Sequence, residues 1–321
     1  MIYIEVLTSI SKIKTVSLLL LIVLTSFLSS CSPEQTISET LNFQPTVKVE
    51  TSPMPFPLTN QMLFDIPYCN LHIASQKLDL YFPSEVNATN PMPALVYVHG
   101  GSWIHGDKSE AGMFAHMVNM QGYVVASVNY RLYPEGRFPN MIEDVKCAIR
   151  FLRAHASEYN IDPNRIATVG TSAGGHLVSL LGTTEFNVGW DVGEYLEQSS
   201  RVQAVVAIAP VTDLTRNFPN ADIEAMRQVG FGEDNIVQAS PITHVSADDP
   251  PFLLIHGNQD TTVPVEQSYL MYERLMQTNV PAQLVIVENG DHSLTSQNAA
   301  VKPTLVEINQ IISEFLATYL K

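Results

Sequence analysis

The sequence is poor in positive charge. Its 321 residues include 17 lysines and arginines against 32 aspartates and glutamates, which gives a formal net charge of −15. A surface that binds nucleic acid needs a basic face to neutralise phosphate groups, so this composition argues against a nucleic-acid partner. Cysteine is scarce as well: there are three, and their spacing matches no metal-site pattern. His99, His105 and His256 could suggest a metal, but their positions favour loop-stabilising roles, and we expect neither metal nor cofactor.

The chain also lacks a hydrophobic run that would span a bilayer comfortably. Its apolar run near the N-terminus, VSLLLLIVLTSFL, follows Lys12 and Lys14 and is typical of a signal-peptide core. The run ends in LSSC (28–31), which resembles the lipobox of bacterial lipoproteins. That resemblance implies acylation of Cys31 as the mature N-terminus, export, and a lipid anchor that holds the protein to a membrane of the cell envelope. An ordinary secretory signal or an uncleaved anchor is the alternative interpretation.

Composition divides the chain into three parts. Residues 1–30 form the predicted signal peptide, and residues 31–60 hold several prolines without periodic patterning, which predicts a flexible tether. Residues 61–321 are long enough to bury a large core and are predicted to be one domain. Export would permit a disulfide between Cys69 and Cys147. Because Cys147 lies on the apolar side of a predicted helix, a buried free thiol fits at least as well, and the pairing stays open.

Strands and helices alternate along the folded part. The segments that predict strands are KLDLYFP, ALVYVHGG, YVVASVNY, RIATVG, VQAVVAIAP, PFLLIHG and AQLVIVE. Helices are expected at 110–121, 139–158 and 265–278, directly after Ser172, and from Leu305 onward. This alternation predicts an α/β fold with a mostly parallel sheet covered by helices on both faces. Ligands bind beyond the carboxyl ends of such strands, so the loops after these ends should converge on one edge.

One of these loops carries GTSAG (170–174). It fits the G-x-S-x-G nucleophile elbow and stands where that motif requires, between the strand RIATVG and a helical pattern. Gly170 and Gly174 leave room for a strained turn that a side chain would crowd, so Ser172 is pushed outward at the apex. A serine that merely caps the helix is the alternative. The assignment of Ser172 as a nucleophile therefore depends on its partners.

A serine hydroxyl needs a base that takes its proton, and the base needs an acid that fixes its tautomer. Beyond the helix that follows Ser172, the chain has three histidines. His292 follows the strand AQLVIVE, on the predicted edge. His256 ends a strand and is expected to stabilise the next loop, while His244 lies away from the predicted loop ends. We therefore predict His292 to be the base.

The acid is expected between the serine and the histidine, in the order that accompanies the elbow motif. Asp260 stands in HGNQDTTVP, just past the strand PFLLIHG, and is the predicted acid. Asp291 adjoins His292, and adjacent loop residues rarely face each other. Asp213 follows an earlier strand and is the fallback.

Acyl transfer also needs N–H donors aimed at the oxygen that becomes negative in the transition state. HGGSW (99–103) follows a strand and offers backbone N–H groups, and Ala173, directly after the serine, offers another. A tight turn alone would also explain HGGS. An elbow, an ordered acid and base, and this loop in one chain nevertheless favour catalysis over coincidence, and we predict that Ser172 is a nucleophile.

The segments HGGSWIHGDK, SVNYRLYPE, IDPNRIATVGTSAGGHL, ASPIT, PPFLLIHGNQDTTVPVEQS and ENGDHS together resemble the hormone-sensitive-lipase-like branch of the α/β-hydrolase superfamily. They are most similar to its small acetyl- and feruloyl-esterase-like carboxylesterases, from about Lys77 to the C-terminus. The resemblance implies an α/β-hydrolase fold with a small cap, and the triad Ser172, Asp260 and His292. It further implies an oxyanion hole formed by the N–H groups of Gly101, Ser102 and Ala173. Ser102 stands where the family often has a third glycine, a change that keeps the backbone donor.

The resemblance also implies a serine esterase that hydrolyses short acyl esters through an acyl-enzyme, with acetylated or feruloylated carbohydrates as candidate substrates. Trp103, beside the oxyanion loop, is the expected substrate-binding side chain. The segments 183–201 and 215–239 could form the cap. Three aromatic residues in them could be pocket walls or ordinary core: Trp190, Phe218 and Phe231.

Two other functions stay open. A small-amide hydrolase of the kynurenine-formamidase type also resembles the HGG-x-W pattern. A catalytically inactive hydrolase-fold binding protein is the other alternative, which the apparently intact triad disfavours.

Overall fold

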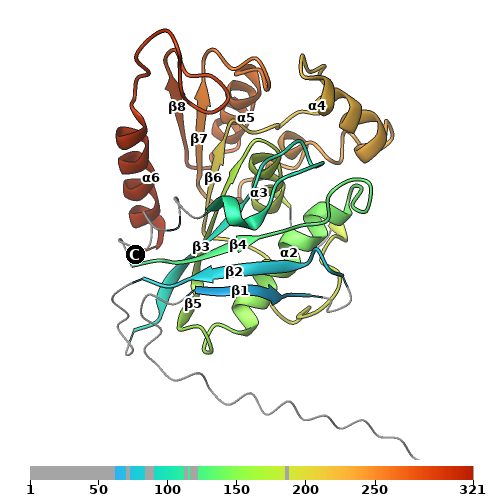
Figure 1. The fold of residues 1–321 in the computed structure, drawn as a ribbon, viewed down its shortest axis with the longest axis vertical. Coiled ribbons are helices and arrows are strands. Elements are labelled where there is room, and N and C mark those ends of the chain that lie inside the picture. Colours follow the sequence, from blue (N-terminus) through green and yellow to red (C-terminus); the bar gives the residue numbers. More distant parts are fainter. Residues whose placement is uncertain are drawn as a thin grey trace, which may run out of the picture. The chain divides into compact units, whose positions relative to one another are not determined.

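An eight-stranded sheet is formed by the part of the chain that the structure describes, in the order β1-β2-β4-β3-β5-β6-β7-β8 (Figure 1). The structure, a computed structural model, describes residues 62–69, 73–83, 90–111, 115, 122–184 and 188–320. The strands are β1 (Met62–Pro67), β2 (Lys77–Tyr81), β3 (Met92–Val98), β4 (Val124–Val128), β5 (Ile161–Thr171), β6 (Ala204–Ile208), β7 (Phe252–Gly257) and β8 (Ala282–Val287). The predicted signal peptide, the tether and Cys31 lie outside the described residues.

From β4 to β8 each neighbouring pair of strands is parallel, whereas β2 is antiparallel to both β1 and β4. The prediction of a mostly parallel sheet is thus confirmed. The register pairs Val98 at the end of β3 with Gly170 on β5, and Gly257 at the end of β7 with Val287 at the end of β8. Because these carboxyl ends are aligned, the loops that follow them begin along one edge of the sheet.

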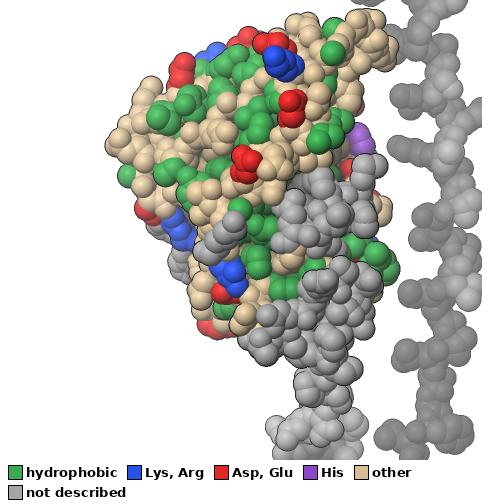
Figure 2. Space-filling model, turned by 90° about the vertical axis from the view of Figure 1, so that its left-hand side faces the viewer, with side chains coloured by type: hydrophobic (Ala, Val, Ile, Leu, Met, Phe, Trp, Pro, Cys, Tyr) green, Lys and Arg blue, Asp and Glu red, His purple; other side chains and the backbone are tan. Residues whose placement is uncertain are grey.

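Helices cover both faces, as the alternation predicts. The helices α2 (Asn140–Ala154), α3 (Ala173–Thr183) and α5 (Glu266–Gln277) contribute to one hydrophobic cluster, and α6 (Leu305–Leu320) contributes to a second one. On the face drawn in Figure 2, hydrophobic side chains form separate patches among neutral and charged ones, and the Lys and Arg side chains are scattered. Scattered exposed apolar side chains are ordinary on protein surfaces.

Where apolar residues recur at regular spacing, the observed helices and strands begin and end within a few residues of the predicted positions. The stripe predicted for α2 is fully buried at Ile142, Val145, Ile149 and Leu152, as expected for an amphipathic helix that packs on a sheet. The helix predicted at 110–121 is a 3₁₀ turn, Lys108–Ala111, in its described part, and most of the remainder lies outside the described residues. No helix in the described part combines the length and apolarity that crossing a membrane demands.

The sequence pattern gives no indication of β1. Its residues are mostly exposed or half-buried, and it forms the edge of the sheet beside β2. An edge strand that is open to solvent can hold its place through backbone hydrogen bonds alone, so it lacks the apolar pattern that marks a buried strand.

A disulfide joins Cys69, just after β1, to Cys147 on α2, with the two Cα atoms 5.6 Å apart. This decides the open question of the pairing against a free thiol at Cys147. The crosslink spans 78 positions of the sequence, and closing a long loop removes conformational freedom from the unfolded chain, an effect of roughly 2–5 kcal/mol in small exported domains.

Residues 188–201, which make up most of the described part of the segment 183–201 that was considered above for the cap, are held against α2 instead. Lys146 and Arg150 bind the two carboxylate oxygens of Asp191 at 3.0 and 2.6 Å. One turn further along α2, Arg153 donates to two carbonyl groups near the end of the segment. These three cations lie at helical spacing on one side of α2. The segment is therefore part of the body of the fold, which corrects the expectation that it contributes to a cap.

Residues 213–245, between β6 and β7, are named the cap segment here. They contain α4 (Ala221–Met226), a π-helical turn (Arg227–Phe231) and a 3₁₀ turn (Pro241–Thr243). The side chain of Asn220 accepts hydrogen bonds from two N–H groups in the first turn of α4, which is ordinary N-capping. Figure 1 shows α4 near the end of the sheet where β7 and β8 terminate. The aromatic side chains of the segment are buried in the core.

Candidate active site

Ser172 lies at the turn between β5 and α3, with φ 57° and ψ −118°. A positive φ is rare for a residue with a side chain and marks strain. The glycines around it are required by space: a Cβ on Gly170 would lie 2.3 Å from the carbonyl oxygen of Gly174, and a Cβ on Gly174 would lie 2.0 Å from that of Val98. The crowding predicted for these two glycines is therefore confirmed. The geometry is that of a nucleophile elbow.

The oxyanion loop, residues 99–106, packs directly on this elbow. A Cβ on Gly100 would lie 2.9 Å from the carbonyl oxygen of Thr171 and 3.4 Å from the Cβ of Ser172. Among the hydrogen bonds between described residues, none uses the backbone N–H of Gly101 or Ser102. Ala173 is the first residue of α3, and the first N–H groups of a helix have no partner within it. Within the described residues, the N–H groups of Gly101 and Ser102 therefore have no hydrogen-bond partner, and that of Ala173 has none within its helix.

Two aromatic rings support the start of this loop. The imidazole of His99 is stacked on Tyr130 with 4.5 Å between the ring centroids, and the Tyr130 hydroxyl donates to the His99 carbonyl at 3.2 Å. The His99 Nδ1–H donates to the carbonyl of Gly100 at 2.8 Å. Burial lowers the pKa of His99, so its ring stays neutral. These contacts hold the chain where it leaves β3.

Asp260 and His292 come together in the loops after β7 and β8. The carboxylate Oδ2 of Asp260 lies 2.7 Å from Nδ1 of His292. The Asp260 side chain is fully buried, whereas the His292 side chain is 26% exposed. A carboxylate only accepts, so Nδ1 carries the proton and Nε2 is left free to act as a base. The structure therefore joins the predicted acid to the predicted base.

A second imidazole shares this carboxylate, which the sequence analysis does not anticipate. His256 Nε2 lies 3.1 Å from Asp260 Oδ2, and Ser268 Oγ lies 2.7 Å from His256 Nδ1. The other carboxylate oxygen accepts from the N–H groups of Thr262 and Val263 at 2.8 and 2.9 Å. Burial opposes ionisation of Asp260, but the hydrogen bonds from His256 and His292 prevail and lower its pKa. The signal in the sequence was their spacing: His256 lies on β7, and Asp260 follows four positions later in the next loop.

The serine and the base lie on the same edge of the sheet. The N–H of Ser172 donates to the carbonyl of Ile208 at the end of β6, and a Cβ on Gly257 would contact the carbonyl oxygens of Gly290 and Asp291, beside His292. Within the described residues, no hydrogen bond joins the Ser172 hydroxyl to His292. Such bonds are often long without substrate and tighten in the reacting complex.

The rejected candidates for acid and base have other partners. Asp213 accepts from the N–H of Thr215 and pairs with Arg216 at 3.1 Å. Asp291 accepts from N–H groups of its own turn. The Nε2 atom of His244 donates to a carbonyl of the cap segment. Each of these side chains therefore stabilises a local turn or segment.

Trp103, the expected substrate contact, has no exposed surface. Its indole packs edge-on against His176 and Phe231 at 5.2 and 4.9 Å between ring centroids. In this conformation Trp103 is thus a packing residue of the oxyanion loop. Phe231, Phe218 and Trp190 are also buried, which favours the core interpretation over pocket walls for them.

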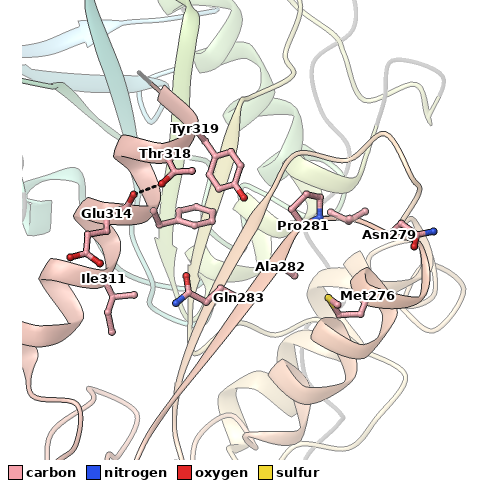
Figure 3. Close-up of a pocket in the computed structure, with 11 residues that line it drawn as sticks. Met276, Asn279, Pro281, Ala282, Gln283, Ile311, Glu314, Thr318 and Tyr319 are labelled. Atoms are coloured by element: carbon pink, nitrogen blue, oxygen red, sulfur yellow. Dashed lines mark hydrogen bonds between the residues drawn. The ribbon is translucent and has the colours of Figure 1, made fainter.

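A cavity of about 580 Å³ lies away from these residues, between the end of α5, the start of β8 and the second half of α6 (Figure 3). Ala282 and Gln283 belong to its lining, at the amino end of β8, whereas His292 follows the carboxyl end. No residue of the predicted triad or oxyanion hole lines it. Within the part of the chain that is described, no group of three or more His, Cys, Asp or Glu side chains could hold a metal ion.

The chain is similar to several known proteins. A probable carboxylic ester hydrolase LipM of Mycobacterium tuberculosis is 34% identical over 75% of this chain and 58% of its own length. A truncated carbohydrate esterase from gut microbiota is 26% identical, with a TM-score of 0.71 over 81% of this chain and 96% of its own. A bifunctional GH43-CE protein of Bacteroides eggerthii is 29% identical, with a TM-score of 0.70 over 83% of this chain and 39% of its own.

The chain spans about half the length of the curated relatives it matches. The sheet order and these likenesses confirm an α/β-hydrolase fold, as the sequence motifs predict. The BD-FAE family model matches residues 78–275, a stretch that includes the oxyanion loop, the elbow and Asp260. The chain belongs to the BD-FAE family of α/β hydrolases.

Proposed function

We propose that the protein is a serine carboxylic-ester hydrolase in which Ser172 is the nucleophile, His292 the base and Asp260 the acid that orients it. The observation that carries this proposal is the 2.7 Å hydrogen bond between the buried Asp260 carboxylate and His292, on the same sheet edge as a serine with φ 57°. Relatives named as ester hydrolases support the reaction class.

The reaction follows from these positions. His292 Nε2 accepts the proton of the Ser172 hydroxyl as its oxygen attacks the ester carbonyl, and Asp260 stabilises the imidazolium that forms. The N–H groups of Gly101, Ser102 and Ala173 stabilise the negative oxygen. The alcohol leaves with the proton from His292, and water then attacks the acyl-enzyme by the same route. Every proton moves between Ser172, His292, alcohol and water.

For the substrate, we propose short acyl esters, with acetyl or feruloyl groups on carbohydrates as the candidates. The cap segment is small, which leaves little apolar surface for a long acyl chain. Two structural relatives, a carbohydrate esterase and a GH43-CE protein, support a carbohydrate as the alcohol part of the ester.

For the location, we propose export and a lipid anchor on Cys31, followed by the tether to residue 60. The Cys69–Cys147 disulfide supports an oxidising compartment. Metabolic labelling with a palmitate analogue tests the anchor: the wild-type chain should be labelled and a Cys31→Ser variant should not. Equal labelling of both chains would contradict it.

A substrate panel tests the activity. Purified protein is assayed with p-nitrophenyl esters from acetate to palmitate, acetyl-xylan, methyl ferulate and N-formylkynurenine. We expect the highest kcat/KM among the shortest acyl groups and turnover of at least one carbohydrate ester. If N-formylkynurenine were hydrolysed faster than every ester, the small-amide hydrolase would replace this proposal. If no substrate were turned over and a fluorophosphonate failed to label Ser172, the inactive binding protein would.

A further inference from the structure

His176 stands four residues after Ser172 on α3 and is fully buried. Both ring nitrogens have partners: the indole N–H of Trp103 lies 3.3 Å from Nδ1, and the carbonyl of Ala239 lies 2.7 Å from Nε2. An indole N–H can only donate and a carbonyl can only accept, so the imidazole must be neutral with its proton on Nε2. One side chain thereby joins three elements: α3, the oxyanion loop and the cap segment.

The oxyanion loop needs such an anchor because its backbone is strained. Gly101, Ser102 and Trp103 have successive φ values of 101°, 50° and 60°. Residues with a Cβ rarely adopt this region, because the Cβ lies too close to the following carbonyl oxygen. The loop is fastened by Trp103, whose carbonyl accepts the N–H of Tyr133 at 2.9 Å and whose indole donates to His176.

The cap segment meets the same cluster through Phe231. This residue ends the π-helical turn, and its ring lies edge-on to His176 at 5.5 Å and to Trp103 at 4.9 Å between centroids. Single π-helical turns occur frequently at functional sites. The carbonyl of Ala239, near the base of the cap segment, accepts the other hydrogen bond of His176. The cap segment and the oxyanion loop thus share one buried histidine.

We propose that His176 is a positioning residue that locks the oxyanion loop to the cap segment and so holds the N–H groups of Gly101 and Ser102 toward the reacting carbonyl. The inference rests on the proposed esterase function. An oxyanion hole acts on charge that develops in the transition state. Loss of its alignment therefore lowers kcat and leaves KM nearly unchanged.

Four variants of the full chain test this with p-nitrophenyl acetate, each assayed well below its own unfolding midpoint. His176→Phe keeps the ring but removes both hydrogen bonds, and should lower kcat roughly 10–100-fold, somewhat less than deletion of a whole oxyanion donor, with KM within threefold. His176→Gln, which can both accept and donate, should recover most of that loss. Trp103→Phe removes the indole donor, together with part of the ring volume, and should lower kcat by a similar factor.

The fourth variant, Leu180→Ala, is the control, because it opens a cavity on α3 that destabilises the protein but removes no hydrogen bond of the oxyanion loop or the cap segment. Its kcat should stay within twofold of the wild type. The double variant Trp103→Phe/His176→Phe should be no slower than the slower of the two single variants, because both single changes remove the Trp103–His176 hydrogen bond.

Two outcomes would overturn the proposal: a kcat for His176→Phe equal to that of Leu180→Ala, or single losses that multiply in the double variant. If His176→Phe does not fold, Trp103→Phe alone decides, and an unchanged kcat contradicts the inference. Ser172→Ala in the same assay distinguishes a failure of the proposed esterase function from a failure of the role proposed for His176. If it retains turnover, the proposed function fails; if it is inactive while His176→Phe keeps its kcat, only the role of His176 fails.

Discussion

The loop that carries Ser172 and the loops that carry Asp260 and His292 differ in what fixes their reactive side chains. Ser172 is placed by its own backbone, with φ 57° beside glycines that have no room for a Cβ. His292 is placed by a side-chain hydrogen bond to a carboxylate that is fully buried, while the imidazole itself is 26% exposed. The nucleophile therefore depends on backbone packing, and the base depends on a hydrogen-bonded charge.

The two loops should therefore be sensitive to two different kinds of substitution. Added volume should disable the nucleophile loop, since its contacts are between backbone atoms that cannot retreat. Loss of charge or of a donor should disable the acid–base loops, since the Asp260 carboxylate is buried and needs its hydrogen bonds. Each of the first four predictions below changes one of these loops and leaves the other intact.

Removal of the nucleophile is expected to have the largest effect. Ser172→Ala removes the attacking oxygen and adds no volume, so the fold should remain and ester turnover should fall roughly 10⁵–10⁶-fold, the scale found when a triad serine is deleted. Turnover of p-nitrophenyl acetate and the thermal unfolding midpoint measure the two effects. Near-normal turnover in the folded variant would exclude Ser172 as the nucleophile.

Loss of the buried charge comes next. Asp260→Asn keeps the volume but removes the anion that orients His292, and kcat should fall about 10⁴-fold, as for triad aspartates generally. The matched control is Asp213→Asn, whose carboxylate is tied to Thr215 and Arg216 and whose loss should change kcat less than threefold. If Asp213→Asn were the more damaging change, the acid would have to be reassigned.

Added volume at the elbow is the third test. Gly174→Ala places a Cβ 2.0 Å from the carbonyl oxygen of Val98, so the end of β3 and the oxyanion loop must shift, and we expect a stability loss of a few kcal/mol together with loss of activity. In Gly189→Ala the new Cβ meets nothing within 4 Å, although φ is +81°, and only about 1–2 kcal/mol should be lost, the cost of the left-handed conformation for a residue with a Cβ. Urea unfolding measures the free energy of unfolding of both variants. A loss in Gly174→Ala no larger than that in Gly189→Ala would show that the atoms around Gly174 make room for the new Cβ.

Removal of the second imidazole that binds the Asp260 carboxylate should lower activity less than the changes above. His256→Gln removes the imidazole that donates to Asp260 Oδ2 and accepts from Ser268. The pKa of Asp260 should rise from its lowered value, and kcat should fall roughly tenfold, which corresponds to about 1.4 kcal/mol of a charge-assisted hydrogen bond. Ser268→Ala removes only the outer member of this chain and should cost less. An unchanged kcat in His256→Gln would show that His292 alone keeps Asp260 in place.

The smallest effect concerns pH and the two loops together. Burial lowers the pKa of His176 to about 4, below the value of about 6.5 for an unfolded histidine. Since the unfolded chain binds this proton more readily, the stability from neutral His176 is lost as pH falls from about 6.5 toward 4. The lowered pKa of Asp260 has the same sense in a lower pH window: its contribution to stability is complete above the ordinary aspartate pKa of about 4 and is lost only as the pH falls below that value.

Chemical unfolding between pH 7 and 4.5 checks this sign. The free energy of unfolding should fall more steeply for the wild type than for His176→Gln, by roughly 2–3 kcal/mol over that range. The Asp260→Asn variant should follow the wild-type slope there. Parallel curves for the wild type and His176→Gln would contradict the assignment of a neutral, buried His176.

Much of the fold could be predicted from the sequence because the strands from β2 to β8 and the helices α2, α3, α5 and α6 bury regular apolar patterns. The edge strand β1 was missed, since it buries little and pairs through its backbone. For the candidate site, the loop positions of Asp260 and His292 were correctly placed on one edge. The shared bond with His256 was not predicted, and Trp103 was expected at a substrate surface but is buried.

Neighbouring residues and distant residues thus determine different features of this protein. The sequence by itself determined the elbow, the glycines around Ser172 and the alternation of strands and helices, because these depend on neighbours within a few residues. Only the tertiary structure decided three sets of contacts: the Cys69–Cys147 disulfide, the ion pairs that hold residues 188–201 on α2, and the hydrogen bonds that join Trp103, His176 and Ala239. These contacts join residues tens of positions apart, and which of them meet depends on the packing of the whole chain.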